Sequence, residues 1–258
     1  MPDLPSRARP RLEDVAAIVA DAGAMALARM GGDYRRWDKS PNNPVSDVDI
    51  DVDVMLRERL AMLAPDAAWL SEETADDPVR LASARVWIVD PIDGTRDYLR
   101  ARDGWCVSVA LVEAGTPVLA VLGAPARGEM WLAEAGQGAS RNGLRLAASA
   151  RRELAGARVP IDALPRRDAD LVAVSKPNSI ALRVAMVAAG EADLIATTRL
   201  GNEWDIAAAV LIAREAGAAV SDARGAPLAF NTRTAEALGV IACAPDLHAL
   251  VVERFGVS

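Results

Sequence analysis

Residues 85–89 read Arg-Val-Trp-Ile-Val and lead directly into residues 90–95, which read Asp-Pro-Ile-Asp-Gly-Thr. The mostly apolar run predicts a strand that delivers two carboxylates, three residues apart, into a tight turn. Gly94 lets the backbone approach a ligand closely, and the N–H groups of Gly94 and Thr95 lie where a short helix is expected to begin, a favourable place for an anion. Carboxylates and an anion are compatible when metal ions lie between them, and Mg²⁺ prefers such oxygen ligands. An isolated Asp-Gly usually marks an ordinary turn, but the complete run after an apolar strand favours a metal and phosphate site.

Three further acidic segments are weak signals when each is taken alone. Residues 71–74 (Ser-Glu-Glu-Thr) contain paired glutamates, which usually form a solvated surface. Residues 201–209 place Asp205 before an alanine-rich run, where an aspartate usually caps a helix, although the alanines are small enough to let that helix pack tightly. Residues 39–49 end in Ser-Asp-Val-Asp, which is also typical of a loop followed by a helix start.

Hydrophobic spacing predicts α+β structure in the first part of the chain and α/β structure in the second. Residues 11–30 carry apolar side chains at helical spacing, and Gly31-Gly32 ends this helix. Strand-like runs between residues 106 and 143 alternate with Gly, Pro and Asn turns, as in an antiparallel meander. The other predicted elements are helices at 48–64, 179–189 and 205–216, strands at 68–70, 171–175, 193–196 and 240–244, an irregular segment at 33–47 and a connector at 147–165.

Composition narrows the chemistry. Of 258 residues, 52% are hydrophobic and 25% are charged, the balance of an ordinary globular protein. The net charge of −7 argues against a general nucleic-acid binder, although bound metal ions reverse the field locally for an anionic substrate. Because His248 is the single histidine, the chemistry must come from carboxylates, hydroxyls, lysine or arginine. We expect Cys106 and Cys243 to be buried free thiols, since both lie in apolar strand-like runs.

Location follows from what the sequence lacks. No run of eighteen apolar residues occurs, which argues against a membrane span. The polar segment from Met1 to Pro10 lacks the apolar stretch of a secretory signal. We therefore expect a short flexible leader and a cytoplasmic protein.

Together and in this order, the four acidic segments resemble the inositol monophosphatase family of lithium-sensitive, metal-dependent phosphatases. The matching signatures are the Asp-Pro-Ile-Asp-Gly-Thr run, the upstream Glu72-Glu73, the Trp-Asp-Ile-Ala-Ala segment at 204–208 and the Pro-Val-Ser-Asp-Val-Asp segment at 44–49. The resemblance covers residues 11–244 and implies an α/β (α+β) fold, a layered α-β-α-β-α sandwich. We divide the chain into an N-terminal α+β part with most metal ligands, residues 1–146, and a C-terminal α/β part, residues 147–258, both forming one catalytic unit.

The resemblance implies a role for each matching residue. The implied ligands for two or three Mg²⁺ ions are Glu72, Asp90, the Ile92 carbonyl, Asp93 and Asp205. Glu72, Asp49 and Thr95 would act in catalysis, with Asp49 holding a metal-bound water or a third ion and Thr95, paired with Asp49, orienting the nucleophilic water. The N–H groups of Gly94 and Thr95 would hold the phosphate. One metal would activate the water and another would stabilise the departing alkoxide, without a covalent phosphoenzyme.

Two departures from the family pattern concern this chain. Ser46 stands where the family usually has threonine, and a hydroxyl is retained. The segment between Ser175 and Ser179 is short, and relatives usually carry an extra strand and helix there. Substrate contacts from that segment are therefore open.

Within the family, the sequence is most similar to the 3′(2′),5′-bisphosphate nucleotidase branch, which removes the 3′-phosphate from adenosine 3′,5′-bisphosphate. The similarity includes Glu203-Trp204-Asp205 and residues 179–183, with Arg183 where that branch has a basic residue. Arg183 would bind the second phosphate by bidentate contact, and Lys39 would lie over the metal site. For these two side chains, the alternatives are a solvated helix arginine and a solvated loop lysine. The alternatives are an inositol monophosphatase or a related sugar- or histidinol-phosphate phosphatase, and an RNA- or transcription-associated partner protein. The family also implies inhibition by Li⁺ and a possible homodimer.

Overall fold

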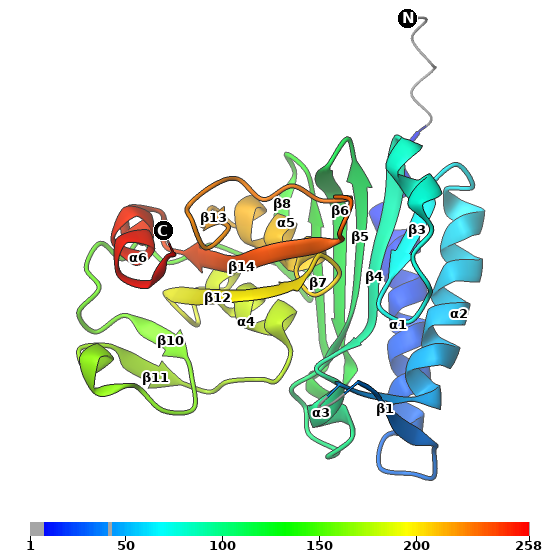
Figure 1. Cartoon of the computed structure of the whole chain (residues 1–258), viewed down its shortest axis with the longest axis horizontal. Helices are drawn as coiled ribbons and strands as arrows, with labels where there is room; N and C mark the ends of the chain where they lie inside the picture. The colour runs from blue at the N-terminus through cyan, green and yellow to red at the C-terminus, as the bar shows by residue number, and fades with distance from the viewer. Residues whose placement is uncertain (1–7, 41–42, 258) are drawn as a thin grey trace, which may run out of the picture.

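The strand that carries the Asp-Pro-Ile-Asp-Gly-Thr run is the second strand of the large central sheet. In the computed structural model, which describes residues 8–40 and 43–257, that strand is β4 (Arg85–Asp93), and it is buried along its whole length. It pairs in parallel with β3 and antiparallel with β5, and the seven strands follow the order β3-β4-β5-β6-β7-β8-β9 (Figure 1). The other strands are β3 (Ala68–Ser71), β5 (Cys106–Glu113), β6 (Thr116–Ala124), β7 (Glu129–Glu134), β8 (Gly138–Arg141) and β9 (Leu144–Arg145). The predicted antiparallel meander is therefore confirmed.

Helices cover both faces of this sheet. Helices α1 (Leu12–Arg29) and α2 (Asp47–Leu63) pack on one face, where the apolar stripe of α1 is buried as its spacing predicts. Helices α4 (Ile180–Ala188) and α5 (Ala207–Glu215) pack on the other. All residues of α5 from Ala207 to Ala213 are buried, because its alanines let the helix lie close to the sheet.

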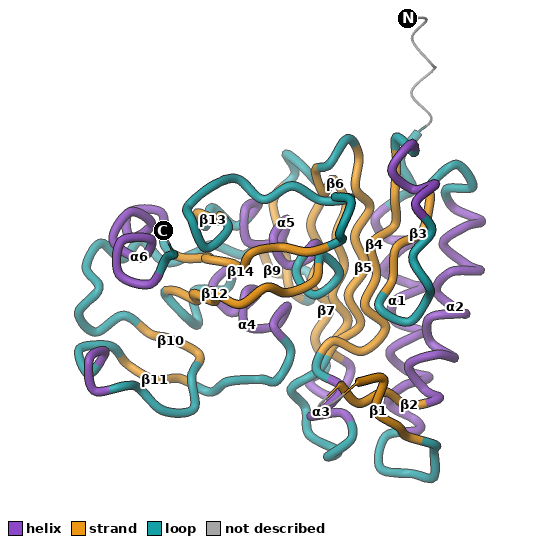
Figure 2. The backbone as a smooth tube through the Cα atoms, in the orientation of Figure 1, coloured by secondary structure: helices purple, strands orange, loops and turns teal. Residues whose placement is uncertain are grey.

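A second, smaller sheet lies beyond α4 and α5, and α6 (His248–Phe255) covers its outer side (Figure 2). Its strand order is β12-β14-β13, with all neighbours antiparallel. The strands are β12 (Leu194–Asn202), β13 (Ala219–Ser221) and β14 (Glu236–Cys243), and a parallel pair β10 (Arg158–Pro160) and β11 (Val172–Val174) lies beside them. The layers are thus α-β-α-β-α, as the sequence predicts.

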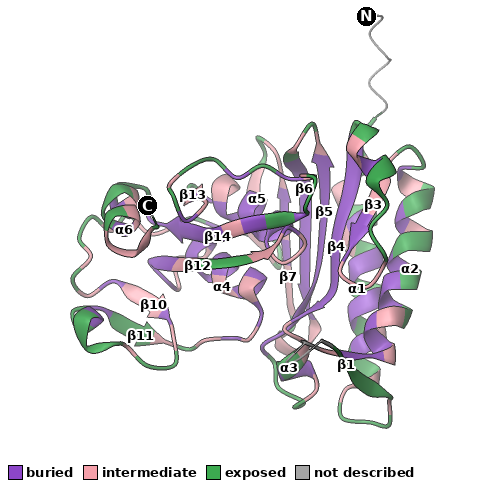
Figure 3. Ribbon diagram, viewed as in Figure 1, coloured by how far each residue is buried: buried purple, intermediate pink, exposed green. Residues whose placement is uncertain are grey.

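One hydrophobic core joins the two halves of the chain. The cluster between the central sheet and α4 and α5 includes Ile88 and Trp131 from the first half and Leu182 and Val210 from the second (Figure 3). This sharing favours a single folded unit, and the division at residue 146 stays a prediction.

Some local predictions are wrong. The segment 33–47, predicted to be irregular, contains a hairpin of β1 (Arg36–Ser40) and β2 (Asn43–Ser46), with residues 41–42 outside the described part. This hairpin tolerates Pro44 because its two strands pair only with each other, so that a missing N–H breaks no wider ladder. The sequence analysis also missed β10 within the predicted connector, β13 and α6, all short elements with weak periodicity.

Other expectations concern single residues and the N-terminus. Cys106 and Cys243 are both free and buried, as predicted. Residues 1–7 of the expected leader, which was predicted to span Met1 to Pro10, lie outside the described part of the chain. Within the described ranges, none of the helices combines the length and the apolar character needed to cross a membrane.

Candidate active site

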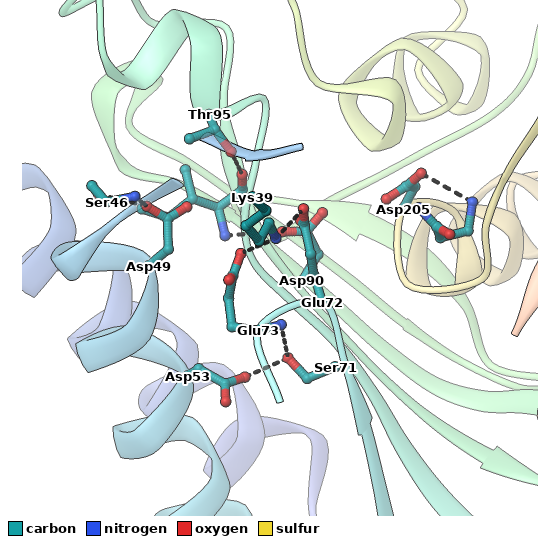
Figure 4. Close-up of polar contacts among 12 residues, drawn as sticks. Lys39, Ser46, Asp49, Asp53, Ser71, Glu72, Glu73, Asp90, Thr95 and Asp205 are labelled. Carbon is teal, nitrogen blue, oxygen red and sulfur yellow. Dashed lines mark hydrogen bonds and ion pairs between the residues drawn. The ribbon is translucent and has the colours of Figure 1, made fainter. Parts of the chain in front are cut away.

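Three carboxylates from three separate elements meet where β4 ends. Glu72 directly follows β3, Asp90 lies in β4, and Asp205 lies two residues before α5. One oxygen of each lies within 4.8 Å of the others. Figure 4 shows Glu72 and Asp90 side by side and Asp205 facing them from another part of the chain. The structure therefore brings together three of the residues that the sequence analysis proposed as metal ligands.

Burial and mutual repulsion oppose ionisation of this cluster. Burial, together with the charges of Glu72 and Asp93, raises the pKa of Asp90 well above its usual value. Burial also raises the pKa of Asp205, and the charges of Asp93 and Glu72 add to the effect. A cation held between the carboxylates offsets both penalties, because it replaces lost hydration and screens like charges. A buried set of carboxylate oxygens fits a hard divalent cation such as Mg²⁺.

The Asp93 carboxylate is directed toward the start of α4. It accepts hydrogen bonds from the Ser179 hydroxyl (2.5 Å) and the Ala181 backbone N–H (2.8 Å). Burial raises the pKa of Asp93 to about 6, although these hydrogen bonds act in the opposite direction. Asp93 lines the same cleft as the three clustered carboxylates, and it also ties β4 to the C-terminal half of the chain.

Of the predicted catalytic pair, Asp49 comes from the first turn of α2 and Thr95 from the start of α3, directly after the turn that ends β4. Asp49 accepts hydrogen bonds from the backbone N–H (2.9 Å) and hydroxyl (2.5 Å) of Ser46 in a capping box at the start of α2. The Thr95 hydroxyl donates to the Ile92 carbonyl (3.1 Å), which is itself a predicted ligand. Burial raises the pKa of Asp49 to about 6. The retained hydroxyl of Ser46 therefore supports Asp49 directly.

Lys39 reaches the acidic cluster from the hairpin. Its ammonium lies 2.9 Å from a Glu72 oxygen and 2.8 Å from a Glu73 oxygen (Figure 4). Burial would lower the pKa of Lys39, but the two carboxylates outweigh it and hold the pKa above its usual value. Burial raises the pKa of Glu73 to about 7. Lys39 thus lies over the predicted metal site.

Most of the predicted site residues line one cleft of about 590 Å³, which also contains arginines: Glu72, Asp90, Ile92, Asp93, Gly94, Thr95, Arg183 and Asp205. Asp49 and Lys39 are not part of this lining. Gly94 enters it with a φ of 96°, at the start of the four-residue helix α3 (Thr95–Tyr98). Arg96, Arg183 and Arg199 line the same cleft. A cleft of this size is suitable for a small molecule, and its mixture of carboxylates and arginines suits a metal-bound phosphate ester.

Arg183 is held by the short segment that precedes α4. Its guanidinium donates to the carbonyls of Pro177 (3.0 Å), Ser179 (3.3 Å) and Asn178. Burial lowers the pKa of Arg183. The side chain is partly buried rather than solvated, and the shortened segment supplies its carbonyl partners.

Sequence reasoning missed several residues that shape this site. Arg199, an exposed residue of β12, lines the cleft, but nothing in the local sequence marks it. Asp53 is buried one turn after Asp49 and accepts hydrogen bonds from Ser71 and from the Thr74 hydroxyl (2.5 Å). It thereby holds both sides of the Glu72-Glu73 pair. The spacing of four residues between Asp49 and Asp53 places both on one face of α2. This spacing is the sequence feature that could have identified Asp53 as part of the site.

Comparison with known proteins agrees with this geometry. The inositol monophosphatase family model matches residues 10–256. The chain is 35% identical over 202 residues to "Nus factor SuhB" of Xylella fastidiosa, covering 73% of this chain and 72% of that protein. It is 34% identical over 209 residues to "3′(2′),5′-bisphosphate nucleotidase CysQ" of Escherichia coli K12, covering 76% and 82%. The structure of an IMPase of Thermotoga maritima superposes with a TM-score of 0.82 at 27% identity, covering 94% of this chain and 95% of that one.

The fold is that of a phosphatase, and the chain belongs to the inositol monophosphatase family. The resemblance inferred from the four acidic segments is therefore confirmed, as is the reaction class, hydrolysis of a phosphoric monoester. The family uses Mg²⁺, and Glu72, Asp90 and Asp205 form an acidic site able to hold a metal ion.

Proposed function

We propose that this chain hydrolyses adenosine 3′,5′-bisphosphate to AMP and phosphate, with Mg²⁺ held by Glu72, Asp90 and Asp205. The observation that carries the proposal is the content of one cleft, where three converging carboxylates and three arginines occur together. Carboxylates alone repel a phosphate ester, and arginines alone would not require the buried acidic cluster. Both are needed when the substrate carries one phosphate bound through metal and a second bound directly by cations.

The residues around the cluster divide the catalytic work. Bound Mg²⁺ would supply charge neutralisation and a lowered pKa for the attacking water. Asp93 and the Ile92 carbonyl offer further oxygen donors to the ions. Asp49 and Thr95 orient the water. The backbone N–H groups of Gly94 and Thr95 hold the phosphate that is cleaved.

The second phosphate is assigned to the arginines of the cleft. Arg199 is exposed and, within the described ranges, has no carboxylate partner, so its charge is available to a ligand. Arg183 lines the same cleft and is held on one edge by backbone carbonyls. The relative named 3′(2′),5′-bisphosphate nucleotidase supports a bisphosphate substrate for this branch. Lys39, which pairs with Glu72, stays a proposed contact to the substrate.

Phosphate release from two substrates tests the proposal. Purified protein is assayed with Mg²⁺ and with EDTA on adenosine 3′,5′-bisphosphate and on inositol 1-phosphate, side by side. We expect Mg²⁺-dependent release and a preference for the nucleotide of at least tenfold in kcat/KM. Equal or better cleavage of inositol phosphate would discard the bisphosphate assignment and retain the metal site. No cleavage of either substrate, nor of histidinol phosphate, would favour a partner role like the one that the name of the Xylella relative suggests.

Arg199→Ala provides the matched variant. Loss of a charged contact to a phosphate costs about 1.5–3 kcal/mol, so KM for the bisphosphate is expected to rise about tenfold or more. The KM for inositol 1-phosphate, which lacks a second phosphate, should stay unchanged. Equal effects on both substrates would contradict the role of Arg199. Arg224→Ala, at a turn outside the cleft lining, serves as the control for loss of one positive charge.

A further inference from the structure

A buried arginine lies outside the cleft but connects the two segments that carry its metal ligands. Arg80, in the short 3₁₀ helix Pro78–Ala82, has only 1% of its surface exposed. Its guanidinium donates to both carboxylate oxygens of Asp76, at 2.5 and 2.9 Å. A second edge donates to the Asn231 side-chain oxygen (2.7 Å) and the Thr232 carbonyl (2.9 Å). The Asn231 amide donates back to the Arg80 carbonyl (3.1 Å), so the contact is reciprocal.

The loop that receives Arg80 is fixed from its other side by a buried glutamate. Glu203 has no exposed surface, and its carboxylate accepts from the backbone N–H groups of Asn231 (2.5 Å) and Thr232 (2.8 Å) and from the Thr232 hydroxyl (2.5 Å). Three donors on one buried carboxylate leave it little freedom to move. Glu203 lies two residues before Asp205, so the position of this loop and the position of the ligand are linked.

The other end of the connection reaches Glu72. Asp76 lies four residues after Glu72, and the intervening Thr74 is bonded to Asp53 on α2. Asp53 therefore holds the backbone on both sides of Glu72, and Asp76 ties the residues that follow to Arg80. A continuous series of hydrogen bonds thus joins the segment of Glu72 to the segment of Asp205, although Arg80 and Asn231 are 151 residues apart in sequence.

We propose that Arg80 is a positioning residue that sets the separation between Glu72 and Asp205 and thereby the affinity of the site for Mg²⁺. The inference rests on the proposed metal site. The planar guanidinium bonds Asp76 and the 231–232 loop at the same time, whereas the single ammonium of a lysine cannot reproduce both edges. Without this connection the two segments still fold against the shared core, but their carboxylates no longer hold a fixed distance. Outer partners of metal ligands typically change metal affinity by about 10–100-fold.

The test is the binding of Mg²⁺ alone, measured by isothermal titration calorimetry on metal-free full-length protein. Arg80→Lys is expected to raise the dissociation constant for Mg²⁺ by about tenfold. Asn231→Gly removes the side-chain oxygen and amide that meet Arg80 while tolerating the φ of 58° at this position, and it should have a similar effect. This second variant keeps the inference testable if the buried arginine cannot be replaced.

Arg254→Lys is the matched control for replacing a multiply bonded arginine by lysine. Arg254 donates to Asp168 and Asp170 at the far end of the molecule, beside α6. It should lower stability to urea without changing the affinity for Mg²⁺. If Arg80→Lys and Asn231→Gly bind Mg²⁺ as tightly as the unmodified protein, Arg80 has only a structural role and the inference is overturned. If the unmodified protein itself binds no Mg²⁺, the proposed metal site fails first, so the two failures are distinguishable.

Discussion

A single methyl group at Gly94 should both destabilise the fold and disturb the proposed phosphate site. Gly94 has a φ of 96°, and a Cβ added there would lie 2.7 Å from the Gly104 carbonyl oxygen and 2.9 Å from the Ser179 backbone nitrogen. These two atoms are hydrogen bonded to each other at 2.8 Å. Both belong to the backbone, so neither can turn away from the new methyl group as a flexible side chain would.

The expected cost of Gly94→Ala has two parts. Left-handed backbone at a residue with a Cβ costs about 1–2 kcal/mol. Forcing a methyl group into a filled space costs about 1–3 kcal/mol more. We therefore expect the free energy of unfolding to fall by about 2–5 kcal/mol. Any folded fraction should also lose kcat/KM, because the N–H groups proposed to hold the phosphate are displaced with the turn.

Gly128→Ala separates these two parts. Gly128 has a φ of 65°, but a Cβ there would meet nothing within 4 Å. It should therefore show the backbone cost alone, about 1–2 kcal/mol. Both variants are unfolded with urea in the presence of EDTA and followed by circular dichroism, so that metal binding does not contribute. If Gly94→Ala is no more destabilising than Gly128→Ala, the close approach of the turn to Gly104 and Ser179 does not constrain this site.

Two further substitutions test electrostatics in opposite directions. Asp90→Asn should raise the stability of the metal-free protein by about 1 kcal/mol, because it removes a buried carboxylate whose pKa is raised by burial and by Glu72, and it should abolish stabilisation by Mg²⁺. Thermal unfolding with MgCl₂ and with EDTA measures both effects, and a less stable apoprotein would contradict the reasoning. Asp193→Asn should cost about 1–2 kcal/mol at pH 7, since hydrogen bonds from Arg158 outweigh burial and hold the pKa of Asp193 at about 2. This stabilisation is present above the ordinary aspartate pKa and is lost as the pH falls toward 2. The difference in the free energy of unfolding between the variant and the unmodified protein, measured with urea, should therefore shrink by about half at pH 3. A larger difference at pH 3 would contradict this assignment.

The parts of the site that the sequence predicts are those with a local physical signal. An apolar run followed by Asp-Pro-Ile-Asp-Gly-Thr identifies a buried strand and its turn, because burial and the need for a positive φ both leave marks within a few residues. The alanines after Asp205 likewise predict a helix that packs closely, and α5 is buried along almost its whole length. Only the joint resemblance to a family made Glu72 a candidate, since paired glutamates have no such local mark.

The contacts that hold these residues have no local signal. Asp93 bonds to Ser179, 86 residues away, and Arg80 bonds to Asn231, 151 residues away. Asp93 belongs to a recognisable run, but in sequence its partner Ser179 and the pair of Arg80 and Asn231 resemble ordinary surface residues. Their burial depends on how the layers close, so no window of sequence could have distinguished them from solvated residues. Arg199 was missed for a related reason, because its role depends on which strand edge faces the cleft.

The division between the ligands and the residues that hold them has a physical cause. A cluster of buried carboxylates weakens the metal-free fold, so its members must be held by contacts that do not depend on the metal. Asp53 and Glu203 meet this requirement, since both are buried and hydrogen bonded. Asp53 accepts from Ser71 and Thr74, on either side of Glu72 and Glu73, whereas Glu203, two residues before Asp205, accepts from the 231–232 loop. Each also lies close in sequence to a predicted site residue, Asp53 to Asp49 and Glu203 to Asp205. Such an anchor is therefore expected at a second acidic residue that lies one helical turn or two positions from a predicted site residue. At that spacing, its hydrogen bonds fix the same stretch of backbone that carries the site residue.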